Sequence, residues 1–315
     1  MQRIVIIGGS GFVGQELVRK LNGKAVILDI TPTREKCEKF IEIDITKPIN
    51  FKFEKDDIVV HLAANQYHSK VPRKNRQEFF DVVNVEGTRR VLEKMDVDGA
   101  RNMVFFSTDM VYGKPQYLPV DTKHPKNPFG FYGKSKIKAE ELCQKYRAKD
   151  FNITIFRPRM IVGKGRFGIL IKLFKLIDMG LPVPVIGNGK NCYQMVSVSD
   201  CADAIIKAME KCCPNREYNL GSKDPPSVRN LLKSLIKSIG TKSFVIPTPG
   251  SLVKLALGIL AKLNLEIMYR EQYMIADKDY IVDISTTETE LGWQPQYDDS
   301  DMLFVAYEGY RGEVK

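Results

Sequence analysis

Hydrophobic and polar positions alternate along the first half of the chain with two different spacings. Short runs rich in Val, Ile and Phe occur at residues 3–7, 25–29, 40–44, 57–63 and 102–107, and between them apolar side chains recur every three or four positions. Runs of the first kind are typical of buried strands, and the longer spacing is typical of amphipathic helices. The alternation of the two predicts an α/β fold, a doubly wound parallel sheet with helices on both faces.

A helix at residues 133–149 and a strand at 153–156 extend this pattern, and Pro158 is expected to end it. Glycine and proline then become frequent around an apolar helix at 170–177, which indicates a second lobe. A helix at 199–210 and the strand that follows it are expected to return to the sheet. We therefore expect a sheet domain at 1–160, with 193–221 returning to it, and a smaller, mostly C-terminal α/β lobe at 161–192 and 222–315.

The composition excludes several classes of protein. With 43% hydrophobic and 27% charged residues, the chain can bury a sizeable core. Its net charge of +10 is scattered and accompanies no nucleic-acid-binding motif, so we expect no nucleic-acid partner. The six cysteines show no CxxC spacing and there are only three histidines, so we expect reduced thiols, no disulfides and no metal site.

The longest apolar stretch, residues 251–265, contains Lys254 and Lys262 and is shorter than the roughly 20 apolar residues that cross a bilayer. We favour an amphipathic helix packed in the second lobe over a membrane-associated segment. The first residues show no charged leader before an apolar segment, so we expect a cytoplasmic protein without a membrane partner. A basic loop is either ordinary surface or faces an anionic substrate; it contains Lys70, Arg73, Lys74 and Arg76.

The segment GGSGFVG places Gly8, Gly11 and Gly14 after a strand and at the start of a helix. Glycines at these positions let backbone N–H groups and the helix N-terminus approach a pyrophosphate, as in a Rossmann-type fold. Asp29 ends the next strand, where a carboxylate accepts hydrogen bonds from the adenosine ribose and repels the 2′-phosphate of NADP. The pattern predicts NAD as the cofactor, although Arg34 leaves NADP open.

Tyr132 and Lys136 form a YxxxK pair whose spacing places both on one helix face. An ammonium and a nicotinamide cation both lower the pKa of a phenol, so this tyrosine is a candidate for proton transfer. The simpler alternative is a surface tyrosine. A second observation favours catalysis, because Ser107 and Thr108 end a strand at the carboxyl edge of the predicted sheet, where such folds bind ligands.

Together these segments resemble the extended short-chain dehydrogenase/reductase family, the NAD-dependent nucleotide-sugar epimerases and dehydratases, over nearly the whole chain. The strings that carry the resemblance are GGSGFVG, HLAA at 61–64, NVEGT at 84–88, STDMVYG, YGKSK, RPRMIVG and ELGWQP. The resemblance implies an enzyme with Thr108, Tyr132 and Lys136 as catalytic residues. It also implies a homodimer formed through helices around 84–92 and 133–146.

The resemblance also implies a set of NAD contacts, with Lys136 on the nicotinamide ribose and Asn84 supporting a nearby water. The expected cofactor-binding residues are Gly8, Gly11, Phe12, Val13, Gly14, Asp29, Asp44, Ile45, Leu62, Ala63, Ala64, Asn84, Ser107, Tyr132, Lys136 and Pro158.

The chain departs from the family at the substrate positions. Met110 stands where the 4,6-dehydratases have a glutamate, which removes their usual base. Met160 replaces an asparagine of familiar 4-epimerases, and their diphosphate-binding arginines near Tyr193 and Tyr273 are missing. Lys190, Arg159, Arg166 and Arg270 are possible substitutes or ordinary surface charges. The substrate candidates are Asp109, Met110, Arg159, Met160, Lys190, Tyr193 and Arg270.

Three functions remain open. The first is a nucleotide-sugar C4 epimerase that works through a 4-keto intermediate by tyrosine-assisted hydride transfer. The second is a dehydrogenase or reductase of a sugar nucleotide or of a hydroxysteroid-like alcohol, for which the leucine-rich stretch at 252–260 would line an apolar pocket. The third is an NAD-binding protein without turnover, which the retained Tyr132 and Lys136 disfavour.

Overall fold

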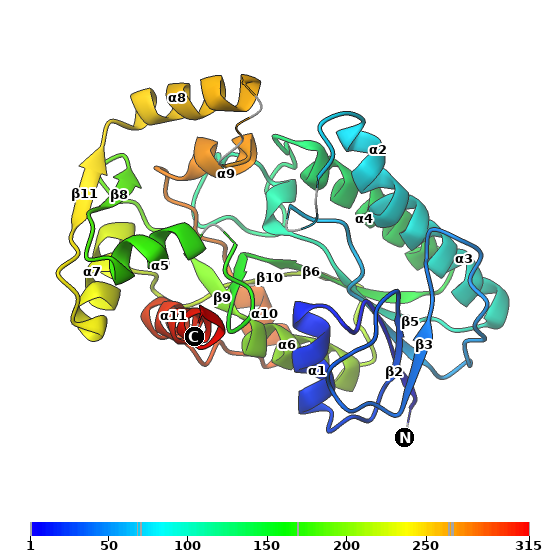
Figure 1. Ribbon diagram of the computed structural model, residues 1–315. Helices are drawn as coiled ribbons and strands as arrows, with labels where there is room; N and C mark the ends of the chain where they lie inside the picture. The colour runs from blue at the N-terminus through cyan, green and yellow to red at the C-terminus, as the bar shows by residue number, and fades with distance from the viewer. Residues whose placement is uncertain are drawn as a thin grey trace.

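The computed structural model describes residues 2–67, 69, 71–168, 170–263, 265 and 268–314. Within these residues the chain forms a seven-stranded sheet of order β10-β6-β5-β4-β1-β2-β3, in which every neighbouring pair is parallel (Figure 1). This order, which moves outward first on one side of β1 and then on the other, is that of a Rossmann fold and confirms the predicted α/β architecture. The strands are β1 (Ile4–Ile7), β2 (Val26–Asp29), β3 (Lys39–Glu42), β4 (Ile58–His61), β5 (Asn102–Phe106), β6 (Asn152–Pro158) and β10 (Glu217–Leu220).

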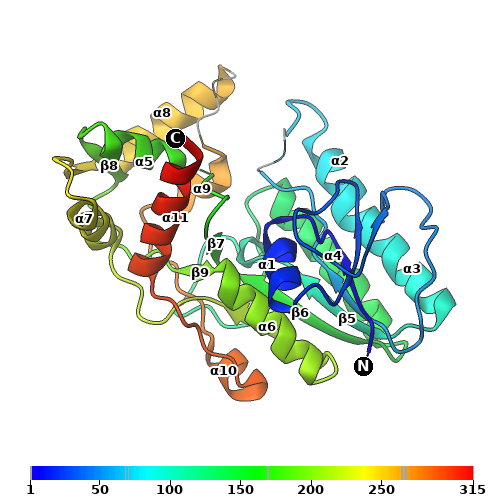
Figure 2. The same cartoon turned by 60° about the horizontal axis from the view of Figure 1, so that its bottom comes forward.

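Helices cover both faces of this sheet (Figure 2). Side chains alternate along each strand, so that Ile6 of β1 packs in one core and Val5 and Ile7 in another. The first core includes α1 (Phe12–Lys20) and α6 (Val198–Glu210). The second includes α3 (Thr88–Asp98) and α4 (Phe131–Arg147), beside the short α2 (Arg76–Asp81) and the π-helical η1 (Val82–Gly87).

A second lobe packs around its own apolar core, which includes Phe174, Leu232 and Tyr307. It is built from α5 (Leu170–Asp178), α7 (Val228–Ile239), α11 (Asp299–Val314) and the parallel pair β8 (Val183–Ile186) and β11 (Val245–Thr248). The strands β7 (Met160–Val162) and β9 (Met195–Ser197) form a second parallel pair. The remaining elements are the 3-10 turn η2 (Asp109–Val111), α8 (Gly250–Lys262), α9 (Arg270–Ile275) and α10 (Ser285–Leu291).

Strand β6 begins one residue earlier and ends two residues later than the predicted strand at 153–156. Pro158 ends the strand, as expected, and is paired with Leu220 of β10. A proline is accepted at the end of a strand because no ladder bond needs its missing N–H there.

Near the C-terminus, Leu291 and Trp293 belong to the core beneath α6, and the indole of Trp293 donates to the Asp200 carbonyl at 2.9 Å.

The largest difference concerns the apolar stretch at 251–265. The expectation that it packs inside the second lobe is wrong for most of its large side chains, because Leu257 is the one buried residue of α8. Periodicity shows that a helix has two faces but not which face meets a neighbour. Among the described residues, no helix has both the length and the apolarity required to span a bilayer. All six cysteines are free thiols.

Candidate active site

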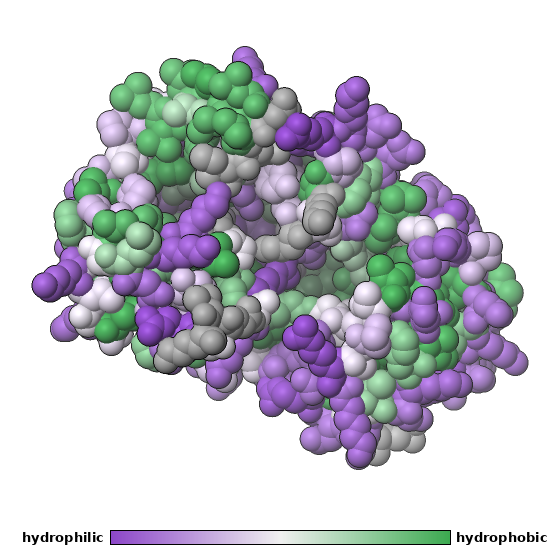
Figure 3. All heavy atoms as spheres, viewed as in Figure 1, coloured by the Kyte–Doolittle hydropathy of each residue, from purple (hydrophilic) through white to green (hydrophobic). Residues whose placement is uncertain are grey.

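A cavity of about 740 Å³ opens at the carboxyl edge of the sheet and extends to the second lobe. Figure 3 shows the molecule hollowed between its two halves. Open α/β sheets bind ligands beyond the carboxyl ends of their strands, so this cavity is the expected site. All the site residues predicted from the sequence line it except Asn84, Lys190 and Arg270.

The glycine-rich turn leaves β1 at one end of the cavity. Gly8 has φ +82°, and a Cβ there would lie 2.5 Å from the Ala63 nitrogen. A Cβ on Gly14 would lie 2.6 Å from the Gly9 carbonyl oxygen, so α1 also begins too close to the turn for a side chain. The turn therefore brings bare backbone and the start of α1 to the cavity wall, as a bound pyrophosphate requires.

Asp29 at the end of β2 is fixed beside this turn. One of its carboxylate oxygens accepts from the Ser10 backbone N–H at 2.9 Å, and the other accepts from the Thr31 N–H at 3.2 Å. The carboxylate lines the cavity, where it can accept from ribose hydroxyls and would repel a 2′-phosphate. Together with the glycine turn, this arrangement fits NAD.

The proposed adenine end of the site lies on the neighbouring strands. Asp44 follows β3, and its carboxylate accepts from the Thr46 N–H at 2.9 Å and from the Thr46 hydroxyl at 2.7 Å. The hydroxyl hydrogen bond from Thr46 is the main cause that lowers the pKa of Asp44. Ile45 and the residues that follow β4 complete this wall, namely Leu62, Ala63 and Ala64.

Tyr132, the second residue of α4, is buried against the opposite wall of the cavity. Burial raises the pKa of its phenol, while the charge of Arg166 and a hydrogen bond with Thr108 lower it. Thr108 follows β5 and caps η2, since its hydroxyl oxygen accepts from the Met110 N–H at 3.2 Å. The phenol therefore needs a further positive charge before it can act as a base at neutral pH.

The ammonium of Lys136 points to the sheet, where it donates to the Phe106 carbonyl at 2.7 Å and lies 4.7 Å from the Phe105 ring. Burial lowers its pKa to about 8. That Lys136 acts on the phenol stays a prediction, and the charge of Arg166 also lowers the pKa of Tyr132. Arg166 follows β7 in the chain and donates to the Gln66 side chain. It is half-buried and lines the same cavity.

Asn84 lies behind the cavity wall in η1 and is fully buried. Its amide oxygen accepts from the Asn65 N–H at 2.8 Å, and its amide nitrogen donates to the Asn65 carbonyl at 3.0 Å and to the Ser135 hydroxyl at 2.9 Å. It therefore ties the loop after β4 to α4 next to Lys136. Its predicted role beside a water stays a prediction.

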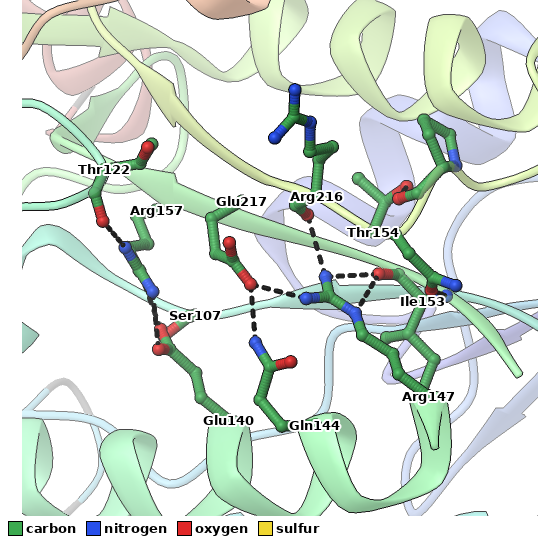
Figure 4. A network of polar contacts seen from close by, with 12 residues as sticks. Ser107, Thr122, Glu140, Gln144, Arg147, Ile153, Thr154, Arg157, Arg216 and Glu217 are labelled. Carbon is green, nitrogen blue, oxygen red and sulfur yellow. Dashed lines mark hydrogen bonds and ion pairs between the residues drawn. The ribbon is translucent and has the colours of Figure 1, made fainter. Parts of the chain in front are cut away.

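A buried ionic network supports the carboxyl end of β5, which leads to Thr108 (Figure 4). The carboxylate of Glu140 on α4 accepts from the Ser107 hydroxyl at 2.6 Å, from two Arg157 nitrogens at 2.9 and 2.8 Å, and from Lys126 at 2.5 Å. Burial raises the pKa of Glu140, but the charges of Arg157 and Lys126 outweigh burial and hold it below its usual value. The network thus fixes Ser107, the residue before Thr108, to β6 and α4.

The substrate candidates separate into two groups. Asp109 and Arg159 form a buried ion pair in the cavity wall, and the Arg159 guanidinium lies 4.4 Å from the Tyr193 ring and 4.0 Å from the Tyr280 ring. Two of its nitrogens have no hydrogen-bond partner among the described residues. Met110, Met160 and Tyr193 line the same cavity. Lys190 and Arg270 are exposed, and the structure brings neither to the cavity.

Two cavity residues have no motif that could have revealed them. The ring of Tyr67 lies 4.3 Å from that of Tyr269 and 5.6 Å from that of Tyr132, so it links the two lobes beside the phenol. Glu271 on α9 is buried, with one carboxylate oxygen unpartnered among the described residues, and burial raises its pKa to about 7. Both residues come from segments far apart in sequence, which only the fold brings together.

A glycine turn, a carboxylate at the end of β2 and a buried tyrosine at one sheet edge are the arrangement of a dinucleotide-dependent oxidoreductase of the short-chain type. The chain belongs to the NAD dependent epimerase/dehydratase family, whose model matches residues 4–221. It is therefore an NAD-dependent enzyme, in agreement with the cofactor predicted from the sequence.

Similar proteins include both an epimerase and a dehydratase. The chain is 30% identical to the N-acetyl-alpha-D-glucosaminyl-diphospho-ditrans,octacis-undecaprenol 4-epimerase of Escherichia coli O157:H7, over 83% of this chain and 80% of the relative. It is 28% identical to the mouse dTDP-D-glucose 4,6-dehydratase, over 76% of this chain and 73% of that enzyme. The crystal structure of the Bacillus cereus UDP-glucuronic acid 4-epimerase with NAD shares the fold, with a TM-score of 0.76 and 21% identity over 100% of both chains.

Proposed function

We propose that this enzyme is a C4 epimerase of a sugar carried on a nucleoside diphosphate. The observation that carries the proposal is the buried Tyr132 phenol, which shares one cavity with Thr108 and with the residues predicted to bind NAD, except Asn84. A sugar hydroxyl at this phenol has a proton acceptor on one side and a cofactor pocket on the other. That combination suits reversible oxidation of a secondary alcohol.

Bound NAD supplies a hydride acceptor, later a hydride donor, together with a positive charge. Tyr132 would take the proton from the C4 hydroxyl while C4 is oxidised to a ketone. Thr108 hydrogen-bonds the reacting oxygen and holds it at the phenol. After the sugar turns and the ketone is reduced from its other face, Tyr132 would give its proton back to the oxygen.

The positive charge of Arg166 favours the phenolate, because opposite charge lowers the pKa of an acid. Lys136 holds the end of β5 through the Phe106 carbonyl, and we expect it to bind the nicotinamide ribose as well. The buried pair of Asp109 and Arg159 fixes the wall beside the reacting carbon.

Several observations favour epimerisation over the alternatives. Met110 lines the cavity where the 4,6-dehydratases of the family have their glutamate, and a thioether cannot take the C5 proton. The hydroxysteroid-like reading loses its main support, because Leu252, Leu255 and Ile259 are exposed on α8 and do not line the cavity.

A second candidate function is the same C4 epimerisation on a sugar that a lipid diphosphate carries in place of a nucleoside diphosphate. The E. coli relative acts, by its name, on a sugar attached to undecaprenol through a diphosphate. A sugar on a polyprenyl diphosphate is therefore a candidate substrate here, and the exposed apolar face of α8 favours it. We also propose that the enzyme is a cytoplasmic homodimer. Light scattering of the purified protein tests whether it is a dimer.

The test combines a substrate panel with one variant. Purified enzyme and NAD are incubated with UDP-, dTDP- and GDP-sugars, NADH absorbance is followed, and products are resolved by NMR. We expect a C4 epimer without accumulated NADH. Tyr132→Phe should lower kcat at least about a hundredfold, the usual contribution of general acid–base catalysis, with NAD affinity nearly unchanged. Tyr117→Phe, at an exposed tyrosine, is the matched control.

Stoichiometric NADH would replace the epimerase with a dehydrogenase. Full activity in Tyr132→Phe would remove the proposed mechanism. A C4 epimer formed only from a polyprenyl diphosphate sugar would decide for the second carrier.

A further inference from the structure

Helix α8 turns its most apolar side to solvent. Leu252, Leu255, Ile259 and Leu263, just beyond its end, are 62%, 62%, 50% and 64% exposed. Their spacing of three and four residues places them on one stripe, opposite the buried Leu257. A helix on a protein surface ordinarily exposes its polar side, and a contiguous exposed apolar patch marks an interaction site.

The stripe belongs to a helix that is held in place from its inner side. Lys254 donates to the Asp277 carboxylate at 2.5 Å and to the Met274 carbonyl at 3.0 Å, so α8 is fixed to α9 and the residues after it. Gly258 faces the Tyr273 hydroxyl, at 3.7 Å from the position of a Cβ. The apolar side is therefore displayed outward by a positioned element.

Basic residues lie near the stripe. Residues 249–265 contain no acidic residue and two lysines, of which Lys254 is paired with Asp277 on the inner side and Lys262 is exposed. Across the cavity, the chain that enters α2 exposes Arg73 and Lys74, while Lys70 of the same basic loop lies outside the described residues. The two lobes meet beside this loop, where the ring centroids of Tyr67 and of Tyr269, at the start of α9, lie 4.3 Å apart.

The figures place α8 and the basic chain that enters α2 on one side of the molecule. In Figures 1 and 2, α8 and the chain that enters α2 lie along the same edge. Figure 3 shows hydrophobic side chains gathered over α8 and hydrophilic ones over the opposite rim. An approaching surface that covers this edge would therefore meet an apolar helix beside a basic loop.

We propose that this edge docks on an anionic lipid bilayer, with the α8 stripe at the boundary between headgroups and acyl chains. Lys262, Arg73 and Lys74 then face anionic headgroups, which is the charge pattern of interfacial helices. A second copy of this chain fits less well, because it would bring like charges together on a protein of net charge +10. This proposal departs from the sequence-based expectation of no membrane partner, which took residues 251–265 as a helix packed in the second lobe.

Docking of this kind would place the cavity beside the membrane, since α9 follows α8 and carries Glu271 into the cavity wall. The proposal explains how a lipid-carried sugar could reach the site. It does not depend on which carrier the substrate has.

The test is co-sedimentation of the full chain, saturated with NAD, with sucrose-loaded vesicles. Vesicles of phosphatidylcholine alone are compared with vesicles that also contain phosphatidylglycerol. The wild type should bind the anionic vesicles, more weakly at high salt. Leu255→Gln combined with Ile259→Gln should lower the partition coefficient about tenfold or more, from the apolar surface that no longer enters the bilayer.

Val97→Gln is the control, because Val97 is an 83% exposed apolar residue on α3 of the other lobe. Arg73→Gln with Lys74→Gln should weaken binding to anionic vesicles only. Equal vesicle binding by the wild type and the α8 variant overturns the proposal, as does no binding to either vesicle. A wild type that is dimeric without lipid and an α8 variant that is monomeric would assign the stripe to self-association instead. Turnover of soluble nucleotide sugars is measured on the same preparations, so failure of docking is distinguishable from failure of the epimerase proposal.

Discussion

Glu140→Gln is expected to destabilise the fold strongly, although Glu140 does not line the cavity. The carboxylate is the common partner of Arg157 and Lys126, and its side chain and that of Arg157 are 1% and 2% exposed. Glutamine keeps the shape but removes the charge, which leaves the guanidinium buried without compensation. Breaking a buried pair in this way costs about 3–5 kcal/mol. That is a large share of the roughly 5–15 kcal/mol that stabilises a typical domain.

The assay is urea unfolding followed through the fluorescence of Trp293, the single tryptophan of the chain, which is buried beneath α6. Lys126→Met is the comparison, because its ammonium is partly exposed and contributes at most about 1 kcal/mol. Adding Arg157→Met to Glu140→Gln removes the uncompensated charge. The double variant should therefore lose less stability than the sum of the two single variants.

The same reasoning fixes a pH dependence. The folded-state pKa of Glu140 lies below its ordinary value, so its contribution is present above the unfolded pKa and is lost as pH falls through the folded pKa. The gap between wild type and Glu140→Gln should be constant from about pH 5 to 8 and shrink below about pH 4.5, near the reference pKa of a glutamate. A loss below about 1 kcal/mol at neutral pH, or one no larger than that of Lys126→Met, would refute the account.

Further predictions concern the two ends of the cavity. Asp29→Ala should weaken NAD binding about tenfold or more and reduce discrimination against NADP, because it removes the ribose acceptor; unchanged titrations with both cofactors would exclude Asp29 from that role. Glu271→Gln should flatten the pH dependence of stability, because a carboxyl whose pKa is raised to about 7 stabilises the fold at acid pH and loses that contribution as pH rises through 7. Urea unfolding at pH 5 and pH 8 gives the free energy of unfolding of both proteins. The same difference between the two pH values in the wild type and in the variant would show that Glu271 titrates normally.

Short segments of sequence already determined the sheet and the cofactor end of the site. The glycine turn and Asp29 act through backbone and side chains within one strand–helix–strand unit, so their spacing along the chain is also their spacing in space. The alternation of strand and helix patterns likewise predicted the doubly wound sheet. Tyr132 and Lys136 share a helix, and their common face followed from the helical repeat alone.

Only the tertiary structure decided which charges and surfaces these elements meet. Lys136 donates to the Phe106 carbonyl. Arg166 comes from the loop after β7, and its charge lowers the pKa of Tyr132. Glu271 reaches the cavity from the second lobe without any motif. The pattern at 251–265 predicted a helix, but whether its leucines face the core or solvent depends on neighbours distant in sequence. Periodicity is a local property of the chain, whereas burial and charge pairing arise from contacts between segments that folding brings together.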